Sequence, residues 1–249
     1  MTDDLFRADA YLRECDARIL RIDESGGIVL DRTVFYPLGG GQAGDSGVLV
    51  LADGRELAIA DTRKAKDAEG RPTDEIVHVP APDQADLLSG LHAGDAVTAR
   101  IDWARRHKLM RFHTATHLLC HLVPQPVNGC SITPEYARLD FHMTDPLDKE
   151  ALTAGLARLV GAAHPLVVGA ISDAELDANP ALVKSMSVQP PRGSGTVRTI
   201  RIGDEAQAID FQPCGGTHVA NTSEIGAVVV TKIEKKSANS RRVVLGWAA

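Results

Sequence analysis

Short apolar runs separated by turn residues fill the first hundred residues, and this pattern constrains the fold more than any other feature of the chain. Apolar and polar residues alternate in the runs ARILRID, IVLDRT, GVLVLA, ELAIADT, EIVHVP and AVTARID. The Asp53-Gly54 pair stands between two of these runs and is a strong signal for a β-hairpin. Several short strands at this spacing are typical of a small barrel or sandwich. We therefore expect residues 1–100 to form an N-terminal β-barrel domain.

Helical periodicity replaces the alternation at about residue 103. Residues 103–122 carry apolar side chains three or four positions apart, and Pro124 ends the pattern. Further helices are predicted over residues 146–163 and from Ser172, with strand-like runs between and after them. Helices laid against an antiparallel sheet define the α+β class. The sequence therefore predicts an α+β protein with a small N-terminal β-barrel and, at residues 101–249, a domain whose helices pack on an antiparallel sheet.

Composition narrows the class of protein. The chain has 249 residues, of which 44% are hydrophobic and 24% charged, as in ordinary globular proteins. Its apolar runs are shorter than the ~18 residues of a membrane span, and the opening MTDDLFRADAYL is acidic where a signal peptide is basic. We expect a cytoplasmic protein with no membrane partner, in which the cysteines are unpaired. The net charge of -6 argues against a bulk nucleic-acid coat protein but permits a local basic patch for RNA.

Two pairs of side chains point to one metal site. His113 and His117 stand four apart on a predicted helix, so their rings lie on one face. A zinc peptidase is disfavoured, because Thr114 stands where that motif needs a glutamate. Cys214 and His218 also stand four apart, around two glycines that allow a tight turn. One thiolate and three imidazoles form a zinc-type donor set, and unrelated core residues are the alternative for each pair.

The chain resembles the editing domain of alanyl-tRNA synthetases, and still more the freestanding AlaX-type alanyl-tRNA editing proteins of medium length. The motifs that carry the resemblance are HTATHLL from residue 113, CGGTH from 214, TSEIG from 222, FYPLGGGQAGDSG from 35, DWARR from 102, MR from 110 and GCSITPEYARLDF from 129. They span about residue 30 to the C-terminus. The resemblance implies that His113, His117, Cys214 and His218 bind Zn²⁺.

The activity that the resemblance implies is hydrolysis in trans of mischarged tRNA(Ala), chiefly Ser-tRNA(Ala), with Gly-tRNA(Ala) as a second candidate. A synthetase pocket sized for alanine cannot strongly reject glycine or serine. Zinc can polarise an ester carbonyl or lower the pKa of a water toward ~7. Four protein ligands close a tetrahedral site, so hydrolysis needs a loose ligand, an expanded coordination shell or a neighbouring water. We expect no ATP requirement, and a non-catalytic tRNA-binding module with structural zinc is the alternative.

Further candidate residues lie within and around these motifs. The catalytic candidates are Thr114 and Thr116, although a helix threonine often bonds its own turn. The substrate-binding candidates, for which an ordinary loop is the alternative, are Gly39, Gly40, Gly41, Gln42 and Asn128. The basic residues expected to contact tRNA phosphates, with a solvated surface as the alternative, are Arg105, Arg106, Arg111, Lys235, Lys236, Arg241 and Arg242.

Overall fold

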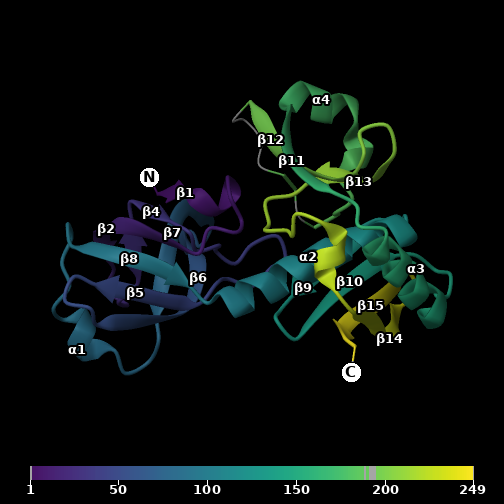
Figure 1. Cartoon of the computed structure of the whole chain (residues 1–249). Helices are drawn as coiled ribbons and strands as arrows, with labels where there is room; N and C mark the ends of the chain where they lie inside the picture. The colour runs from purple at the N-terminus through teal and green to yellow at the C-terminus, as the bar shows by residue number, and fades with distance from the viewer. Residues whose placement is uncertain (1, 188, 191–194, 249) are drawn as a thin grey trace. The chain divides into compact units, whose positions relative to one another are not determined.

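The computed structural model in Figure 1 describes residues 2–187, 189–190 and 195–248. The chain divides into two compact units. The first consists of residues 1–39 and 43–107, and the second of residues 40–42 and 108–249. The longer stretch of the second unit therefore begins at residue 108, and the domain boundary expected at residue 100 stays a prediction. Residues 40–42, from the glycine-rich motif, belong to the second unit although they lie far from it in the sequence.

Six strands of the first unit pair in a ring. They are β2 (Glu14–Ile22), β3 (Ile28–Leu30), β5 (Gly47–Leu51), β6 (Glu56–Lys66), β7 (Pro72–Pro80) and β8 (Ala96–Ile101). The order is β2-β3-β7-β6-β5-β8, and β8 pairs again with β2. The shorter elements of this unit are β1 (Asp3–Asp4), η1 (Leu5–Arg7), β4 (Arg32–Thr33) and α1 (Ala85–Leu88). Every predicted apolar run of the first hundred residues therefore contributes to a strand.

Alternation along the strands places apolar side chains in the core of this unit. Burial alternates residue by residue in β8, where Val97, Ala99 and Ile101 are buried. The hairpin predicted at Asp53-Gly54 is confirmed, because β5 and β6 pair in antiparallel fashion and Gly54 has a φ of 85°. A left-handed φ of this kind favours glycine, which has no Cβ to clash with the backbone.

A histidine is also buried in the first unit. Nε2 of His78 lies 2.8 Å from the hydroxyl of Thr33, and Nδ1 lies 3.0 Å from the carbonyl oxygen of Ile28. Desolvation by burial lowers the pKa of His78 to about 4. This histidine is therefore neutral in the folded protein at ordinary pH.

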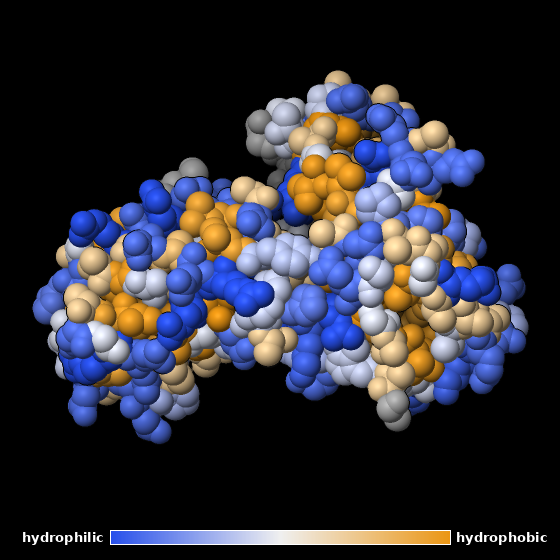
Figure 2. Space-filling view, in the orientation of Figure 1, coloured by the Kyte–Doolittle hydropathy of each residue, from blue (hydrophilic) through white to orange (hydrophobic). Residues whose placement is uncertain are grey.

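The second unit combines helices with two antiparallel sheets, which confirms the α+β class. One sheet has the order β14-β15-β10-β9, and the other β11-β12-β13. The strands are β9 (Val127–Ile132), β10 (Tyr136–His142), β11 (Leu166–Ser172), β12 (Thr196–Gly203), β13 (Ala208–Pro213), β14 (Val228–Ser237) and β15 (Ser240–Trp247). Val167 and Val168 of the edge strand β11 are exposed. Figure 2 shows an apolar patch, coloured orange, over the three-stranded sheet.

The predicted helices are present, and side-chain caps mark the starts of two of them. They are α2 (Trp103–Leu122), α3 (Lys149–Gly161) and α4 (Asp173–Ala178), with the short turns η2 (Pro180–Leu182) and η3 (Thr222–Ile225). The side chain of Asp148 accepts a hydrogen bond from the third residue of α3, and Ser172 forms a capping box with Glu175 at the start of α4. Phe112 of α2 packs against Trp247 of β15, with ring centroids 4.0 Å apart. This contact holds the middle of α2 on the four-stranded sheet.

Candidate metal centre

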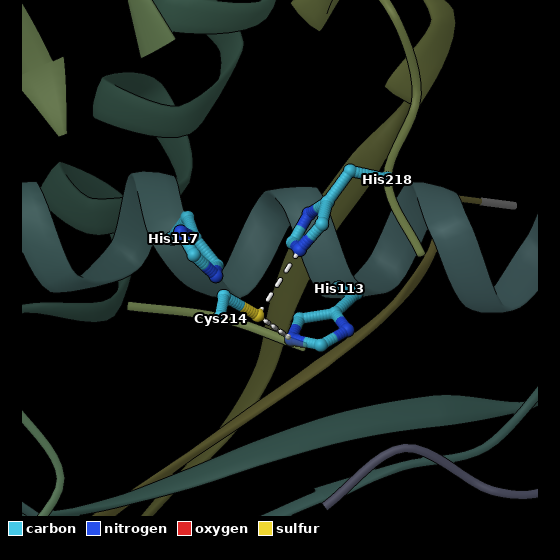
Figure 3. A group of neighbouring side chains, drawn as sticks. All are labelled: His113, His117, Cys214 and His218. Atoms are coloured by element: carbon cyan, nitrogen blue, oxygen red, sulfur yellow. Dashed lines mark hydrogen bonds between the residues drawn. The ribbon is translucent and has the colours of Figure 1, made fainter. Parts of the chain in front are cut away.

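Four side chains of the second unit converge on one point, as Figure 3 shows. His113 and His117 lie one turn apart on α2, whereas Cys214 and His218 come from the loop between β13 and η3. Each residue offers one ligand atom, and these atoms all lie within 4.8 Å of one another. The three histidines are 4–5% exposed, and Cys214 is half-buried. The two pairs predicted from their spacing therefore form one cluster.

The cysteine sulfur lies against the inner edges of the histidine rings. Nε2 of His113 is 3.4 Å from Sγ of Cys214, and Nε2 of His218 is 3.3 Å from it. Burial opposes ionisation of the Cys214 thiol, but His113 and His218 bring its pKa well below the usual value. The thiolate is the form that binds a metal.

The outer nitrogen of each ring has a partner on the opposite side from the sulfur. Nδ1 of His113 is 2.7 Å from Oε1 of Gln42. Nδ1 of His117 is 2.7 Å from a carboxylate oxygen of Asp210. Both partners are acceptors, so each of these nitrogens carries the proton and donates it outward.

Thr114 provides the outer partner of the third histidine. Its hydroxyl donates to the carbonyl oxygen of Met110 at 2.9 Å, so its oxygen accepts from Nδ1 of His218 at 3.2 Å. All three rings therefore have the same tautomer, with Nδ1–H directed outward and the Nε2 lone pair directed inward. Outer-shell bonds of this kind fix the orientation of metal-ligating histidines. Three imidazole nitrogens and one thiolate fit Zn²⁺ in both ligand type and number.

His117 is held in a more polar setting than the other two histidines. Burial lowers its pKa, but the hydrogen bonds to Asp210 and Cys214 outweigh burial and raise the pKa to about 9. A metal that binds Nε2 must displace any proton from that atom, while the proton on Nδ1 can stay with Asp210. Metal binding at this centre is therefore accompanied by proton release.

The Cys-Gly-Gly-Thr-His loop is fixed from two sides. Nη1 of Arg198, on β12, donates to the carbonyl oxygens of Cys214 at 2.6 Å and Gly216 at 3.1 Å. A Cβ at Gly216 would overlap the ring of His113. The second glycine of this loop is therefore required for the close approach of the loop to α2, and the arginine holds that approach in place.

The glycine-rich segment joins the metal centre through its last residue. Gln42 is fully buried; its Nε2 donates to the hydroxyl of Thr217 at 2.8 Å, and its Oε1 accepts from the backbone N–H of Thr217 at 3.2 Å. Gly41 has a φ of 86°, and a Cβ there would lie 2.8 Å from Sγ of Cys130. The glycines therefore let the segment pass close to β9 and deliver Gln42 to both His113 and the loop.

The other predicted site residues lie in different elements of the fold. The hydroxyl of Thr116 donates to the carbonyl oxygen of His113 at 2.7 Å and is buried, as a helix threonine that bonds its own turn. Asn128 lies half-buried in β9. Gly39 belongs to the first unit, where its carbonyl oxygen accepts from the hydroxyl of Tyr36 at 2.9 Å. The catalytic and substrate-binding roles expected of these residues stay predictions.

Two of the seven basic residues expected to contact phosphates are buried. Arg106 is fully buried in the first unit, where it forms an ion pair with the buried Asp45 and donates to the carbonyl oxygens of Ala10 and Val34. Arg241 is 8% exposed and donates to backbone carbonyl oxygens, among them that of Thr144. Both guanidinium groups are therefore engaged by contacts within the protein.

The remaining five basic residues differ in how far they are engaged. Lys235 and Lys236 are exposed on β14. Arg242 is paired with Asp140, Nε to Oδ1 at 2.6 Å. Arg111 donates to the carbonyl oxygen of Ile225 at 2.7 Å and lies over the ring of Trp247. Arg105 donates to the carbonyl oxygen of Gly44 at 3.2 Å. Exposure therefore favours the two lysines as phosphate contacts.

Sequence reasoning missed four residues that support the ligands. They are Lys184, Arg198, Asp210 and Gln212. Asp210 gave one usable signal, because it interrupts the apolar run AQAIDF of a predicted strand, and a buried carboxylate requires a partner. The other three are ordinary polar residues in the sequence, and only the fold brings them to the site.

Comparisons with known proteins assign a family. Residues 197–244 match the threonyl and alanyl tRNA synthetase second additional domain, and residues 10–105 match the class II (A) tRNA synthetases. The chain is 32% identical to an alanyl-tRNA editing protein AlaX-M of Saccharolobus solfataricus, over 98% of both chains. It is 33% identical to one of Methanosarcina barkeri, also over 98% of both. An alanine–tRNA ligase of Sulfurisphaera tokodaii is 33% identical over 94% of this chain but only 25% of the ligase. Within the described residues, each helix is too short or too polar to cross a membrane.

Proposed function

The chain belongs to the family of AlaX-M alanyl-tRNA editing proteins, and we propose that it hydrolyses the ester bond of mischarged tRNA(Ala) in trans, chiefly that of Ser-tRNA(Ala) and secondarily that of Gly-tRNA(Ala). The observation that carries this proposal is the cluster of His113, His117, Cys214 and His218. Its four donors, with every Nε2 directed inward, are suited to Zn²⁺ in a chain whose relatives are editing proteins.

The need for such an activity follows from the size of the amino acids. Alanine, glycine and serine differ by one methyl or one hydroxyl group, and a pocket that accepts alanine gains only ~1–3 kcal/mol of discrimination from such a difference. A second site that hydrolyses the wrong ester raises the overall accuracy. The proposed partner is therefore tRNA(Ala) that carries serine or glycine.

Some residues hold the metal and others leave room for the substrate. Zinc bound at the cluster supplies a Lewis acid that can polarise an ester carbonyl or lower the pKa of a water. Gln42 and Thr114 keep the Nδ1–H groups of His113 and His218 directed outward. Cys214 is the least buried of the four ligand residues, so we propose that the ester approaches from the side of this residue.

The tRNA contacts are proposed for exposed basic residues of the second unit. Lys235 and Lys236 lie on β14 at the edge of the four-stranded sheet, and both are exposed. Long flexible ammonium groups at an exposed edge suit nonspecific contacts with RNA phosphates. Arg105, Arg111 and Arg242 complete the set as residues that would have to exchange a present contact for a phosphate.

The proposal is tested by deacylation assays on three substrates side by side: Ser-, Gly- and Ala-tRNA(Ala). Zinc-loaded protein should release serine fastest and leave alanine attached. Cys214→Ala should lose zinc and activity together, because it removes the thiolate ligand. The matched control is Cys15→Ala, which removes a half-buried cysteine of the first unit and should keep both.

The same assay separates the alternative function. A protein that binds zinc and tRNA but releases no amino acid from any of the three substrates would be a tRNA-binding module with a structural zinc. A closed set of four protein ligands is typical of structural zinc, so this outcome is a specific competitor. Equal release of alanine and serine would contradict an editing role.

A further inference from the structure

One of the three outer partners in the metal centre carries a charge. Gln42 and Thr114 are neutral, whereas the partner of His117 is the carboxylate of Asp210. Asp210 lies on β13 and is 2% exposed. Its Oδ2 accepts from Nδ1 of His117 at 2.7 Å and from Nε2 of Gln212 at 2.8 Å. Both lone-pair directions of this oxygen are therefore used at the metal centre.

The other oxygen of the same carboxylate is held by a lysine from a distant segment. Oδ1 of Asp210 is paired with the ammonium group of Lys184, whose side chain is 27% exposed. The backbone on either side of this lysine follows the edge strand β9: the N–H of Val127 donates to the carbonyl oxygen of Lys184, and the N–H of Met186 to that of Val127, each at 2.8 Å. Two backbone hydrogen bonds therefore hold the segment from which the Lys184 side chain extends.

We propose that Asp210 is the positioning residue of the metal centre, which holds His117 with Nε2 directed at the metal, and that Lys184 balances the charge of the carboxylate without itself positioning the ring. The inference rests on the zinc binding in the proposed function and is independent of the substrate. It concerns a step before catalysis, since it determines how tightly and in which geometry the metal is held.

The physical reason lies in the strength of the outer bond. A hydrogen bond to a charged acceptor is about twice as strong as one between neutral groups. Of the three histidines, His117 therefore has the most strongly held Nδ1–H. An asparagine at this position keeps one acceptor oxygen but loses the charge, so it holds the buried N–H more weakly and leaves the ring freer to turn. Loss of an outer-shell partner typically lowers metal affinity about 10–100-fold.

A purely structural role predicts a different outcome. If Lys184 and Asp210 merely brace β13 against the segment beside β9, removal of either residue should have the same effect on zinc. If Asp210 acts through His117, removal of the lysine leaves the Asp210–His117 bond in place. The two variants therefore distinguish the readings.

The experiment measures zinc affinity by competition with a chromophoric chelator on the full-length protein. Asp210→Asn should bind zinc about 10–100-fold more weakly than the wild type. Lys184→Met should stay within a few-fold of the wild type. Asp140→Asn is the matched control, because it neutralises a half-buried carboxylate, paired with Arg138 and Arg242, away from the metal ligands; it should leave zinc affinity unchanged.

A double-mutant cycle tests the route through the histidine. In a His117→Ala background, Asp210→Asn should cause no further loss of zinc affinity, because its target is absent. The absorption spectrum of the Co²⁺-loaded protein gives a second readout: Asp210→Asn should shift the ligand-field bands, and Lys184→Met should not. Should Asp210→Asn fail to fold, the double variant Lys184→Met/Asp210→Asn, which removes both charges, takes its place in the same cycle.

The outcomes separate this inference from the proposed function. Equal losses in Asp210→Asn and Lys184→Met, or additive losses in the His117→Ala cycle, would overturn the positioning role. Wild-type affinity in Asp210→Asn would overturn it as well. A wild-type protein that binds zinc but hydrolyses no ester would contradict the proposed function and leave the positioning role to be decided by the affinities alone.

Discussion

Truncation of Gln42 is the sharpest test of how the glycine-rich segment serves the metal centre. Gln42 accepts from Nδ1 of His113 at 2.7 Å and from the backbone N–H of Thr217 at 3.2 Å, and it donates to the hydroxyl of Thr217 at 2.8 Å. Both partner residues are buried. In Gln42→Ala these polar groups stay buried without this partner, and each such group costs about 1–3 kcal/mol.

The effect on zinc can be bounded from the same contacts. An outer-shell partner is typically worth about 10–100-fold in metal affinity, which corresponds to about 1.4–2.7 kcal/mol. The expected result for Gln42→Ala is therefore a loss of zinc affinity in that range, together with a lower free energy of unfolding of the metal-free protein. Gln42→Glu keeps an acceptor for His113 and Thr217 and should hold zinc close to the wild-type affinity.

The assay is chelator competition at fixed pH on the wild type and both variants, followed by deacylation of Ser-tRNA(Ala) at saturating zinc. Saturation should restore part of the activity of Gln42→Ala, because the ligands themselves are intact. The reasoning is refuted if Gln42→Ala binds zinc as tightly as the wild type. It is refuted equally if Gln42→Glu loses as much affinity as Gln42→Ala.

Three further predictions follow from single features. Gly216→Ala should lose zinc in elemental analysis while the chain stays folded, because the added Cβ displaces the ring of His113; full zinc content would contradict this. Burial holds the pKa of His78 at about 4 in the folded chain, whereas in the unfolded chain it lies near 6.5, so the unfolded chain binds a proton that the folded chain does not. The free energy of unfolding measured in urea should therefore fall by about 3 kcal/mol as the pH drops from 6.5 to 4. His78→Gln should flatten that profile. Lys235→Ala/Lys236→Ala should raise KM for Ser-tRNA(Ala) several-fold and lower the salt slope of binding by about 0.7–0.9 for each lost phosphate contact, with zinc content unchanged; an unaltered KM would show that tRNA binds elsewhere.

The metal ligands could be predicted because their information is local. His113 and His117 are neighbours on any helix by virtue of their spacing, and Cys214 and His218 are brought together by a turn that glycine permits. The donor types then identify the metal class. The strands of the first unit were predictable for a similar reason, since alternation and the Asp53-Gly54 turn act over a few residues.

The hydrogen-bond partners of the supporting residues could not be predicted because they are distant in the sequence. Asp210 lies 93 positions from His117, and Gln42 lies 71 from His113. Arg106 shows the converse error. A cation near the start of a helix reads as a surface charge, yet Asp45, 61 residues away, draws it into the core. Pairings of this kind are properties of the fold, and local patterns carry no signal for them.

The assignment of residues 40–42 to the second unit has a consequence for how this protein can be rebuilt. A gene fragment that starts at residue 108 encodes all four metal ligands but lacks Gln42, the residue that orients His113. A graft of the metal centre onto another protein must therefore bring two separate stretches of chain. A recombination event between them separates Gln42 from the metal ligands. The centre is portable only as a discontinuous module.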